Sequence, residues 1–342
     1  MKILITGNLG YIGSVLTERI NKSIFEIVGL DVGFYKNCFF SEVNSEFKQI
    51  VMDLRDISEK DIKGFEGIIH LASLSNDPLG ELKPNLTNDI NYKATLKLAK
   101  LAKLNGVKRF VYASSQSMYG VSDKDEELDE DNSDKNPITT YAKTKWKAEV
   151  ELKKLSDDNF VVSCFRPSTV FGSSPRLRCD IVFNNLLASA YTMGRIDIFS
   201  DGTPWRPVVH INDVCDAFLC GLVAPPNLVN GKAFNVGIDN GNFTVSDLAK
   251  VAQKLVPGSK IIISGEHMDA RTYKVSFKRI LSQLNSYFNP KWNLENGGQE
   301  LINYFKEIRF DEKMFKDRYF NRLNQLEYLQ KNNLINSDLR WI

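Results

Sequence analysis

The sequence is poor in the residues that build metal centres and disulfide frameworks. It has only three histidines, and its five cysteines include no C-x-x-C pair and no metal-ligand spacing with those histidines. We therefore expect reduced thiols and no metal site. The cysteines are Cys38, Cys164, Cys179, Cys215 and Cys220.

Long hydrophobic runs are absent as well. No stretch approaches the roughly 18 apolar residues that span a membrane, and the amino terminus, MKILITG, enters a strand pattern without a hydrophobic segment of signal length. A charge excess is also lacking, since the formal net charge is +2 and Lys and Arg are spread along the chain. These absences favour a cytoplasmic protein that binds neither membranes nor nucleic acids.

What the sequence does contain is an alternation of short β-rich runs and helix-length stretches. This alternation is typical of an α/β fold, in which crossover helices connect the strands of a parallel sheet. The 342 residues suit one large α/β unit or two closely associated domains. The expected strands are KILIT, EIVGLD, FKQIVMD, GIIHLA, KRFVYAS and FVVSCFRP.

Four other segments have patterns of their own. Residues 85–104 and 141–155 are amphipathic and are expected to form core or interface helices. The acidic run at 123–134 is expected to be a solvated surface loop. Residues 311–342 carry apolar side chains at helical spacing, which predicts an amphipathic helix packed on the body or on a second subunit, without a cofactor role. These side chains are Phe315, Phe320, Leu323, Leu326 and Leu329.

The first motif that carries chemistry is TGNLGYIG, which places Gly7, Gly10 and Gly13 between an expected strand and an expected helix. Glycine permits a tight turn, lets backbone N–H groups approach a pyrophosphate and lets the helix pack close to the sheet. The spacing G-x-x-G-x-x-G is one residue longer in its first step than the usual dinucleotide fingerprint. The motif indicates a phosphate site at the helix amino terminus, with a plain turn as the alternative.

Two aspartates follow neighbouring expected strands. Asp31 ends EIVGLD, where a carboxylate can accept hydrogen bonds from the adenosine ribose and repel a 2′-phosphate. The position favours NAD over NADP, and the alternative for Asp31 is a turn-forming role. Asp53 follows the next strand, near where the adenine would lie.

Tyr141 and Lys145 are four residues apart and so share one face of an expected helix. A tyrosine acts as a base only when ionised, and its free pKa of about 10 must fall by about three units for that at neutral pH. A lysine cation beside it shifts the pKa in this direction. Because such a pair also occurs by chance, its meaning depends on Ser115, a hydroxyl that follows the strand KRFVYAS.

Together these motifs resemble the extended short-chain dehydrogenase/reductase family, and within it the NAD-dependent epimerase/dehydratase branch that acts on nucleotide sugars. The resemblance runs from Met1 to about Arg309 and also includes HLAS at 70–73, SSQSMYG, YAKTK, RPSTVFG and VVHINDV. It implies a nicotinamide cofactor, NAD, and hydride transfer at a sugar carbon, usually C4.

The resemblance also implies an architecture. We expect a Rossmann-type doubly wound parallel sheet that binds NAD at 1–175, to which the chain returns at about 207–236. A smaller carboxyl-terminal α/β domain, mostly at 176–310, is expected to bind a nucleotide-diphosphate sugar, and 311–342 forms a helical extension. The family usually dimerises through a four-helix bundle, here built from the two amphipathic segments, so a homodimer is expected.

The family pattern assigns roles to individual residues. Tyr141 is implied as the general base, Lys145 as the residue that holds the nicotinamide ribose, and Ser115 as the group that polarises the reacting oxygen, with Ser117 as a further catalytic hydroxyl. The implied NAD-binding residues are Gly7, Gly10, Tyr11, Ile12, Gly13, Asp31, Asp53, Leu54, Leu71, Ala72, Ser73, Asn91, Tyr141, Lys145 and Pro167. The implied substrate-binding residues are Ser115, Gln116, Asn185, Leu186, Arg206 and Arg271, with Arg176 and Arg178 as additional candidates.

Some of these assignments have plainer alternatives. Guanidinium groups match phosphate oxygens, so two arginines around a diphosphate make physical sense. Arg206 and Arg271 could instead form surface ion pairs, and Asn185 could begin a helix. His210, within the apolar run PVVHI, is expected to be a core histidine rather than a catalyst.

The stretch SSQSMYG bears on the reaction. In the family's 4,6-dehydratases and decarboxylases, acidic residues stand where this sequence has Gln116 and Ser117, and elimination of water needs an acid and a base. An epimerase needs only oxidation at C4, rotation of the ketone and reduction on its other face. A nucleotide-sugar 4-epimerase is therefore expected first. A C4 dehydrogenase or 4-ketoreductase, as in a sub-branch acting on nucleotide-linked heptoses, stays open, followed by a 4,6-dehydratase and a non-enzymatic NAD-binding regulator.

Overall fold

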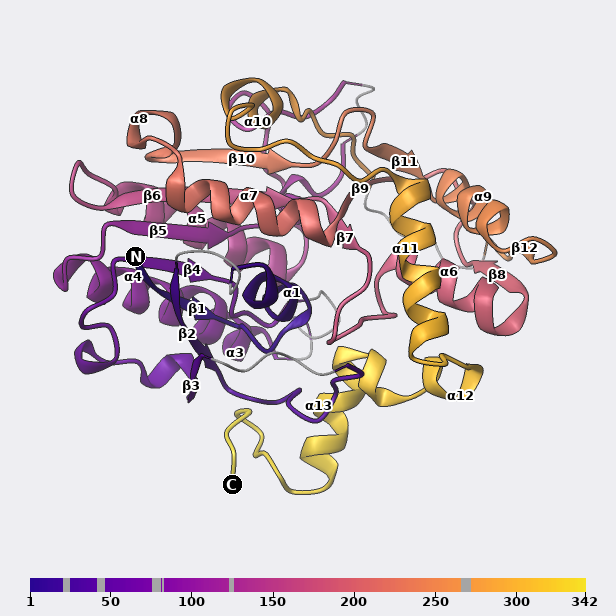
Figure 1. Ribbon diagram of the computed structural model, residues 1–342, viewed down its shortest axis with the longest axis horizontal. Helices are drawn as coiled ribbons and strands as arrows, with labels where there is room; N and C mark the ends of the chain where they lie inside the picture. The colour runs from indigo at the N-terminus through magenta and orange to yellow at the C-terminus, as the bar shows by residue number, and fades with distance from the viewer. Residues whose placement is uncertain (21–24, 42–46, 76–80, 82, 123–125, 266–271) are drawn as a thin grey trace.

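A seven-stranded parallel sheet with the order β10-β6-β5-β4-β1-β2-β3 forms the centre of the computed structural model (Figure 1). All residues are described except 21–24, 42–46, 76–80, 82, 123–125 and 266–271. The strands are β1 (Lys2–Thr6), β2 (Glu26–Asp31), β3 (Lys48–Val51), β4 (Gly67–His70), β5 (Arg109–Ala113), β6 (Val161–Pro167) and β10 (Lys232–Val236). Each of the six expected strands is present, and the order confirms the doubly wound α/β fold.

Helices cover both faces of this sheet, as Figure 1 shows. Ile3 and Ile5 of β1 belong to the core cluster on the side of α1 and α7, whereas Leu4 belongs to the cluster on the side of α4 and α5. Strands buried on both faces read as nearly continuous apolar runs, which explains KILIT. The helices are α1 (Tyr11–Ile20), α7 (Ile211–Val223) and α8 (Pro226–Val229), then α3 (Pro84–Asn88), the π-helical η3 (Asp89–Ala94), α4 (Thr95–Leu104) and α5 (Thr140–Leu155).

Both amphipathic segments expected to be helical are helical. The first is one continuous run of α3, η3 and α4, and the second is α5, whose buried residues include Ala142, Lys145 and Leu152. The two segments pack against each other on the same face of the large sheet. The homodimer expected to form through them stays a prediction.

The carboxyl-terminal half adds two small sheets. One has the order β11-β9-β7, and in the other β8 pairs in parallel with β12. Their strands are β7 (Thr169–Phe171), β9 (Trp205–His210), β11 (Asn242–Thr244), β8 (Arg195–Ile198) and β12 (Lys260–Ile263), and the helices beside them are α6 (Val182–Met193), α9 (Val245–Leu255) and α11 (Leu294–Glu307). The short helix α10 (Lys278–Gln283) instead packs against β10 of the large sheet. One apolar cluster joins side chains of this half, such as Phe183 and Leu248, to those under the large sheet, such as Val111.

Short helices and single helical turns complete the described elements. Three lie in loops next to the large sheet: η1 (Leu54–Asp56), η2 (Glu59–Asp61) and η4 (Gln116–Tyr119). Three more form the carboxyl-terminal extension: α12 (Glu312–Phe315), η5 (Arg318–Phe320) and α13 (Arg322–Lys331).

The extension is not the single helix that its periodicity predicts. Asp311, Asp317 and Asn321 each adopt an extended backbone, and their side chains accept hydrogen bonds from the turns that follow. Such capping residues begin a new helix and thereby end the previous one. The extension packs on the body, as one alternative expected, and lies below β2 and β3 in Figure 1.

The acidic run is only partly the solvated loop that was expected. Residues 123–125 lie outside the described part, but Glu130 is buried and accepts a hydrogen bond of 2.8 Å from the backbone N–H of Asn235. Leu128 is buried as well, while Asp131 is exposed and pairs with Arg279. The prediction is wrong for Leu128 and Glu130 because the tertiary fold supplies partners that a charge pattern does not reveal.

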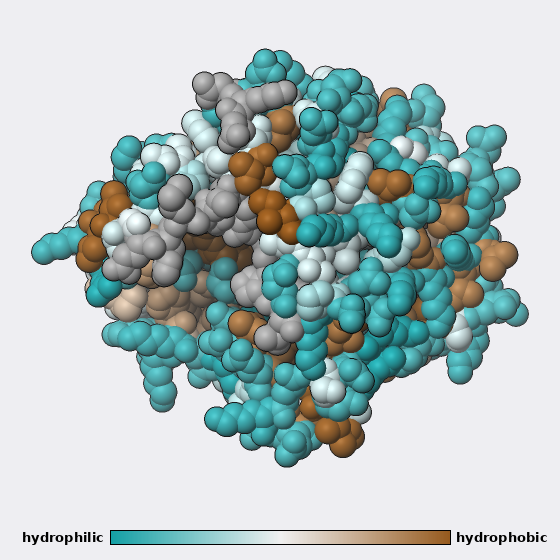
Figure 2. Space-filling model, turned by 180° about the vertical axis from the view of Figure 1, so that it is seen from behind, coloured by the Kyte–Doolittle hydropathy of each residue, from teal (hydrophilic) through white to brown (hydrophobic). Residues whose placement is uncertain are grey.

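The five cysteines are all buried and free. Within the described residues, no three or more His, Cys, Asp or Glu side chains gather as a metal-binding group. No helix among them has the length and apolar character required to cross a membrane. Figure 2 shows the face opposite to that of Figure 1, where hydrophilic residues predominate and hydrophobic ones form small groups.

Candidate active site

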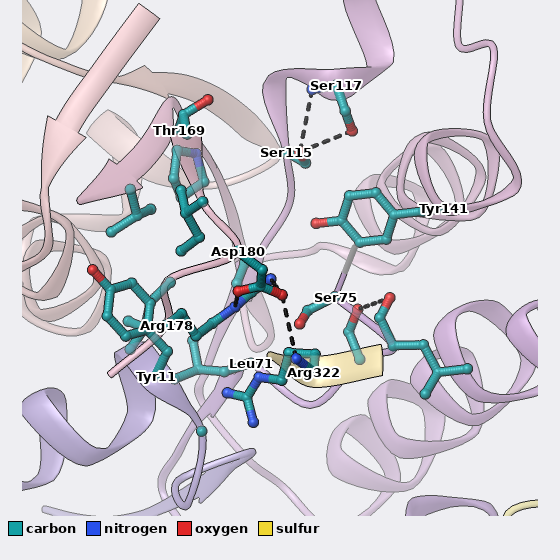
Figure 3. Close-up of a pocket in the computed structure, with 18 of the residues that line it drawn as sticks. Tyr11, Leu71, Ser75, Ser115, Ser117, Tyr141, Thr169, Arg178, Asp180 and Arg322 are labelled. Carbon is teal, nitrogen blue, oxygen red and sulfur yellow. Dashed lines mark hydrogen bonds and ion pairs between the residues drawn. The ribbon is translucent and has the colours of Figure 1, made fainter. Parts of the chain in front are cut away.

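A cavity of about 830 Å³ opens at the carboxyl edge of the large sheet (Figure 3). The loops after β1, β2, β4, β5 and β6 meet there, because parallel strands all end at the same edge. The cavity brings together most of the predicted site residues: Gly7, Gly10, Tyr11, Ile12, Gly13, Asp31, Asp53, Leu54, Leu71, Ala72, Ser73, Ser115, Ser117, Tyr141, Lys145, Pro167, Asn185, Leu186 and Arg206.

The glycine-rich loop has no room for a side chain at Gly7 or Gly13. Gly7 has a φ of +76°, and a Cβ there would lie 2.7 Å from the backbone nitrogen of Ala72. A Cβ on Gly13 would lie 2.2 Å from the carbonyl oxygen of Gly7. The loop thus brings its backbone against the start of α1 and the β4 loop, a cradle of the kind that holds a pyrophosphate.

Asp31 lies at the end of β2 and lines the cavity. Its carboxylate accepts hydrogen bonds from the backbone N–H groups of Gly33 (2.8 Å) and Leu9 (3.3 Å). Burial raises the pKa of Asp31 against the lowering effect of these bonds. The residue therefore shapes the turn, as the alternative held, while it also faces the cavity with acceptor capacity left for ribose hydroxyls.

Asp53 follows β3 and is already paired. Its carboxylate accepts two hydrogen bonds from the Arg55 side chain, of 2.9 and 2.6 Å. Burial alone would raise the pKa of Asp53, but the Arg55 contacts outweigh it and lower the pKa. Asp53 thus contributes a negative charge, held by Arg55, to the end of the cavity next to β3.

Tyr141 and Lys145 both project from α5. The Nζ of Lys145 donates a hydrogen bond of 2.8 Å to the carbonyl oxygen of Ala113 and lies 5.9 Å from the centroid of the Tyr141 ring. Burial lowers the pKa of Lys145 to about 7. In Figure 3 the phenolic oxygen of Tyr141 faces the side of the cavity on which Ser115 lies.

Ser115 caps the short helix η4, which begins directly after β5. Its Oγ accepts a hydrogen bond of 3.2 Å from the backbone N–H of Ser117, and the two hydroxyl oxygens lie 2.9 Å apart. Both residues line the cavity opposite Tyr141. The arrangement offers hydroxyl groups to a sugar oxygen held between Ser115 and Tyr141.

Gln116 does not join them, which corrects the expectation that it binds substrate. Its side chain is buried, and its Nε2 donates a hydrogen bond of 3.0 Å to the carbonyl oxygen of Arg166. Its Oε1 accepts one of 3.1 Å from Ser168. The alternation of directions along η4 turns Gln116 into the core and Ser117 into the cavity.

Asn91 also lies behind the cavity rather than in it. Its side chain accepts a hydrogen bond of 2.8 Å from the backbone N–H of Leu74 and donates one of 3.1 Å to the carbonyl oxygen of the same residue. Both polar atoms of its side chain are thus bonded to the backbone of Leu74. Asn91 instead fixes the loop after β4, whose residues Leu71 to Ser75 line the cavity.

The remaining candidates divide between cavity and core. Arg206 and Asn185 line the cavity, and Asn185 lies in the first turn of α6; their binding of substrate stays a prediction. Arg176 is buried outside the cavity and donates to the carbonyl oxygen of Tyr319 at 2.6 Å. Arg271 lies outside the described residues. His210 is fully buried and stacks on Trp292 with ring centroids 4.2 Å apart, which confirms the core histidine.

The cavity is also lined by residues that the sequence motifs do not predict as site residues, or predict only as additional candidates. Arg178 and Asp180 form an ion pair with distances of 2.8 and 3.0 Å and lie near Arg322 in Figure 3. Arg178 is one of the additional substrate-binding candidates, whereas no sequence motif around Arg322 predicts a binding residue. Further lining residues are Thr169, Val170, Phe199 and Tyr273.

Comparison with known proteins gives a family match over most of the chain. The model of a family described as the NAD dependent epimerase/dehydratase family matches residues 3–237. The UDP-glucose 4-epimerase of Mycolicibacterium smegmatis is 30% identical over 252 residues, which cover 69% of this chain and 77% of that protein. The UDP-glucuronate 4-epimerase of Thermodesulfobacterium geofontis is 25% identical over 326 residues, which cover 89% and 96%.

Solved structures share the fold. MoeE5, solved in complex with UDP-glucose and NAD, superposes with a TM-score of 0.76 at 23% identity, covering 90% of this chain and 99% of the other. At this identity the likeness extends to the fold, including the large sheet and the smaller carboxyl-terminal part.

Proposed function

The chain belongs to the NAD-dependent epimerase/dehydratase family, and from this premise we propose that it is a nucleotide-sugar 4-epimerase. The protein is an enzyme that uses NAD. Within the family, the observation that favours epimerisation is the pair of neutral hydroxyl groups, Ser115 and Ser117, opposite Tyr141.

The residues of the cavity fit the cofactor. Glycine at positions 7 and 13 lets the loop pack closely against its neighbours at the start of α1, where backbone N–H groups of the helix amino terminus would bind a pyrophosphate. Asp31 would accept hydrogen bonds from the adenosine ribose, and Lys145 would donate to the nicotinamide ribose. We assign the cofactor to residues 1–175 and 207–236 and the sugar nucleotide mostly to 176–310.

The chain's own groups would carry out the proton chemistry. Tyr141 would accept the proton of the sugar C4 hydroxyl and return it after the ketone has turned, while Ser115 donates a hydrogen bond to the same oxygen. The positive charge of Lys145 would stabilise a phenolate on Tyr141. When bound, NAD supplies the acceptor for the C4 hydride and the donor that returns it.

Dehydration at C5 and C6 lacks support in the described cavity. It would need a carboxyl group beside Ser115, and the residue in that place, Ser117, has none. The carboxylates that do line the described cavity have partners elsewhere. They are Asp31 with Gly33 and Leu9, Asp53 with Arg55, Asp180 with Arg178, and Asp197 with Arg195.

The substrate class follows from the relatives and the cavity together. Two relatives are named as 4-epimerases of UDP-glucose and UDP-glucuronate, and we propose a UDP-linked hexose as the substrate. Arg206 would bind the diphosphate, since it lines the cavity and a guanidinium group matches phosphate oxygens.

The test is product analysis with NAD and UDP-glucose or UDP-glucuronate in D₂O. The expected result is a mixture of the two C4 epimers with unchanged mass and no net absorbance from NADH, because the hydride returns in each turnover. Stoichiometric NADH with a 4-keto sugar would replace the proposal with a C4 dehydrogenase. A product that has lost water and gained deuterium would establish a dehydratase whose acid lies elsewhere.

A further inference from the structure

A guanidinium group from the far end of the chain lies in the cavity. Arg322 is the first residue of α13, its side chain is only 4% exposed, and it lines the cavity together with Asn321 and Leu323. Figure 3 shows it next to Asp180, on the side opposite Tyr141. The carboxyl-terminal extension therefore reaches into the site that the first half of the chain builds.

The donors of Arg322 are incompletely used. Its Nε and Nη1 are buried and have no hydrogen-bond partner among the described residues. The guanidinium group instead lies over the ring of Tyr35, 3.9 Å from the ring centroid. A charged donor left buried and unpaired is costly. An anion bound at Nη2, the guanidinium nitrogen nearest Gly10, would offset the cost of this buried charge.

The charges around Arg322 leave room for such an anion. Arg178 and Asp180 neutralise each other through their two hydrogen bonds. Arg176, buried nearby, has two more nitrogens without partners among the described residues. Arg178 and Arg322 in the cavity lining and Arg176 behind it thus lie near two carboxylates, those of Asp180 and Asp31, so the surroundings of Arg322 carry an excess of positive charge.

The position of the guanidinium group identifies the anion. A Cβ built on Gly10 would lie 3.7 Å from the Nη2 of Arg322, so the group stands beside the glycine-rich loop. That loop leads into α1, whose amino terminus presents backbone N–H groups and a favourable dipole to a phosphate. Two features from opposite ends of the chain therefore converge on one anion position.

We propose that Arg322 is a cofactor-binding residue whose guanidinium group donates hydrogen bonds to the pyrophosphate of NAD, so that the extension closes the dinucleotide site. The inference rests on the NAD site described above, but neither on the identity of the sugar nor on epimerisation. It revises the expectation that residues 311–342 have no cofactor role.

The extension is anchored well enough to serve in this way. We call residues 318–341 the clasp. Gln325 donates a hydrogen bond of 3.1 Å to the carbonyl oxygen of Phe34, and the Trp341 indole donates one of 2.7 Å to that of Val32. Both acceptors follow Asp31 at the end of β2. The apolar side of the clasp also packs against three segments of the first half of the chain, through Phe34 after β2, Leu74 after β4 and Leu86 of α3. The clasp side chains in this cluster are Leu326, Leu329, Ile335 and Leu339.

A second anchor holds the clasp near the adenine end. Arg340 lies 3.4 Å from the carboxylate of Asp53, and Arg55 donates a hydrogen bond of 3.3 Å to the carbonyl oxygen of Leu339. The clasp thus spans from the expected pyrophosphate to the expected adenine. An enzyme that returns the hydride it has taken must retain NADH between the two steps, and the clasp would slow its departure.

The test compares three ligands by calorimetric titration: NAD, ADP and adenosine. NAD and ADP contain the pyrophosphate, whereas adenosine does not. The variant Arg322→Gln removes the charge, and Arg322→Lys keeps it with a single ammonium group. Lys313→Gln is the matched control, because Lys313 lies on the same extension but is exposed and outside both the clasp and the cavity lining.

Arg322→Gln should weaken the binding of NAD and ADP by roughly 10- to 100-fold, the range for a hydrogen bond to a charged group, and that of adenosine by less than about threefold. Arg322→Lys should fall between, and Lys313→Gln should bind all three like the wild type. NAD affinity of Arg322→Gln within about threefold of the wild type would overturn the proposal, as would an equal loss for adenosine. A wild-type protein that binds NAD but forms no epimer would remove only the proposed reaction, because the affinities still decide the role of Arg322.

Discussion

The hydroxyl oxygens of Ser115 and Ser117 lie 2.9 Å apart, and only Ser115 stands at the cap of η4. Ser115 is thus held by the backbone N–H of Ser117 in a fixed position, which suits a group that must meet a reacting oxygen. Ser117 completes this pair but has no carboxylate with which to move a proton.

The first prediction separates the two hydroxyls. Ser115→Ala should lower kcat by about 10- to 100-fold, since it removes a hydrogen bond to an oxygen that gains charge in the transition state. Ser117→Ala should lower it by less than about tenfold. Steady-state kinetics on the same UDP-sugar checks both, and a larger loss for Ser117→Ala would reverse the two roles.

Tyr141→Phe removes only the phenolic oxygen. We expect turnover to fall by at least about 100-fold, as is typical when a general base is lost. NAD affinity should stay within about threefold of the wild type, because the ring and its packing remain. Turnover and calorimetry together provide the check, and retention of more than about a tenth of the turnover would remove Tyr141 from the base role.

Asp31 should set the preference for NAD over NADP. Its carboxylate faces the expected adenosine ribose and would repel an added phosphate. Asp31→Asn should weaken NAD binding and narrow the ratio of the NAD and NADP dissociation constants by about tenfold or more. Titrations of both cofactors measure this ratio. Wild-type protein that binds NADP as tightly as NAD would contradict the assignment.

Lys145 should reduce the stability of the cofactor-free protein. Burial lowers its pKa from the ordinary 10.5 to about 7, so between these values the unfolded chain binds more protons and stability rises with pH. The cost is full below about pH 7 and vanishes above about 10.5. At pH 6.5, Lys145→Met should therefore be more stable by about 1–3 kcal/mol, with a difference that shrinks towards pH 10.

Denaturant unfolding at several pH values measures the effect of Lys145→Met. The control is Lys143→Met on the same helix, whose side chain is exposed. An equal change in both variants, or one that does not depend on pH, would show that deprotonation of Lys145 is not the cause.

Glu149 and Arg166 form a fully buried ion pair behind Ser114, with nitrogen to oxygen distances of 2.6 and 3.0 Å. Glu149→Gln should lower the free energy of unfolding by about 3–5 kcal/mol, because it leaves the buried Arg166 charge without the carboxylate that neutralises it. Glu151→Gln on the exposed side of α5 should change it by less than about 1 kcal/mol. Chemical denaturation checks the pair.

The same ion pair has a pH dependence of known sign. Although burial raises the pKa of Glu149, the Arg166 contacts outweigh it, so the folded pKa lies below the usual 4.5. Its stabilisation is therefore present above about pH 4.5 and is lost as the pH falls through the folded value. The difference between wild type and Glu149→Gln should shrink in acid.

The sequence by itself determined the parts that depend on local geometry. Strands buried on both faces must be apolar throughout, so KILIT and its counterparts marked the sheet, and the loops after them marked its carboxyl edge. The positions of Gly7 and Gly13 followed in the same way, since no other residue fits a backbone so close to its neighbours. Tyr141 and Lys145 were placed together by the period of one helix.

Only the tertiary structure decided which way side chains outside regular strands and helices turn. Gln116 and Ser117 are adjacent, yet the first hydrogen-bonds within the core and the second lines the cavity, because η4 follows neither a strand nor an α-helical period. Asn91 lies in η3, and the family pattern implies a contact with the cofactor. Its side chain instead bonds to the backbone of Leu74 in the loop after β4, a contact that no local sequence pattern encodes.

The position of Arg322 in the cavity depends on how the carboxyl-terminal extension packs on the first half of the chain. The periodicity of residues 311–342 predicts a single amphipathic helix. It does not reveal that the capping residues Asp317 and Asn321 divide the extension into separate helices. Where those helices dock is decided by apolar side chains of the first half of the chain, far away in the sequence. A guanidinium group arrives beside Gly10 only as a result of that docking, so no local pattern could have revealed it.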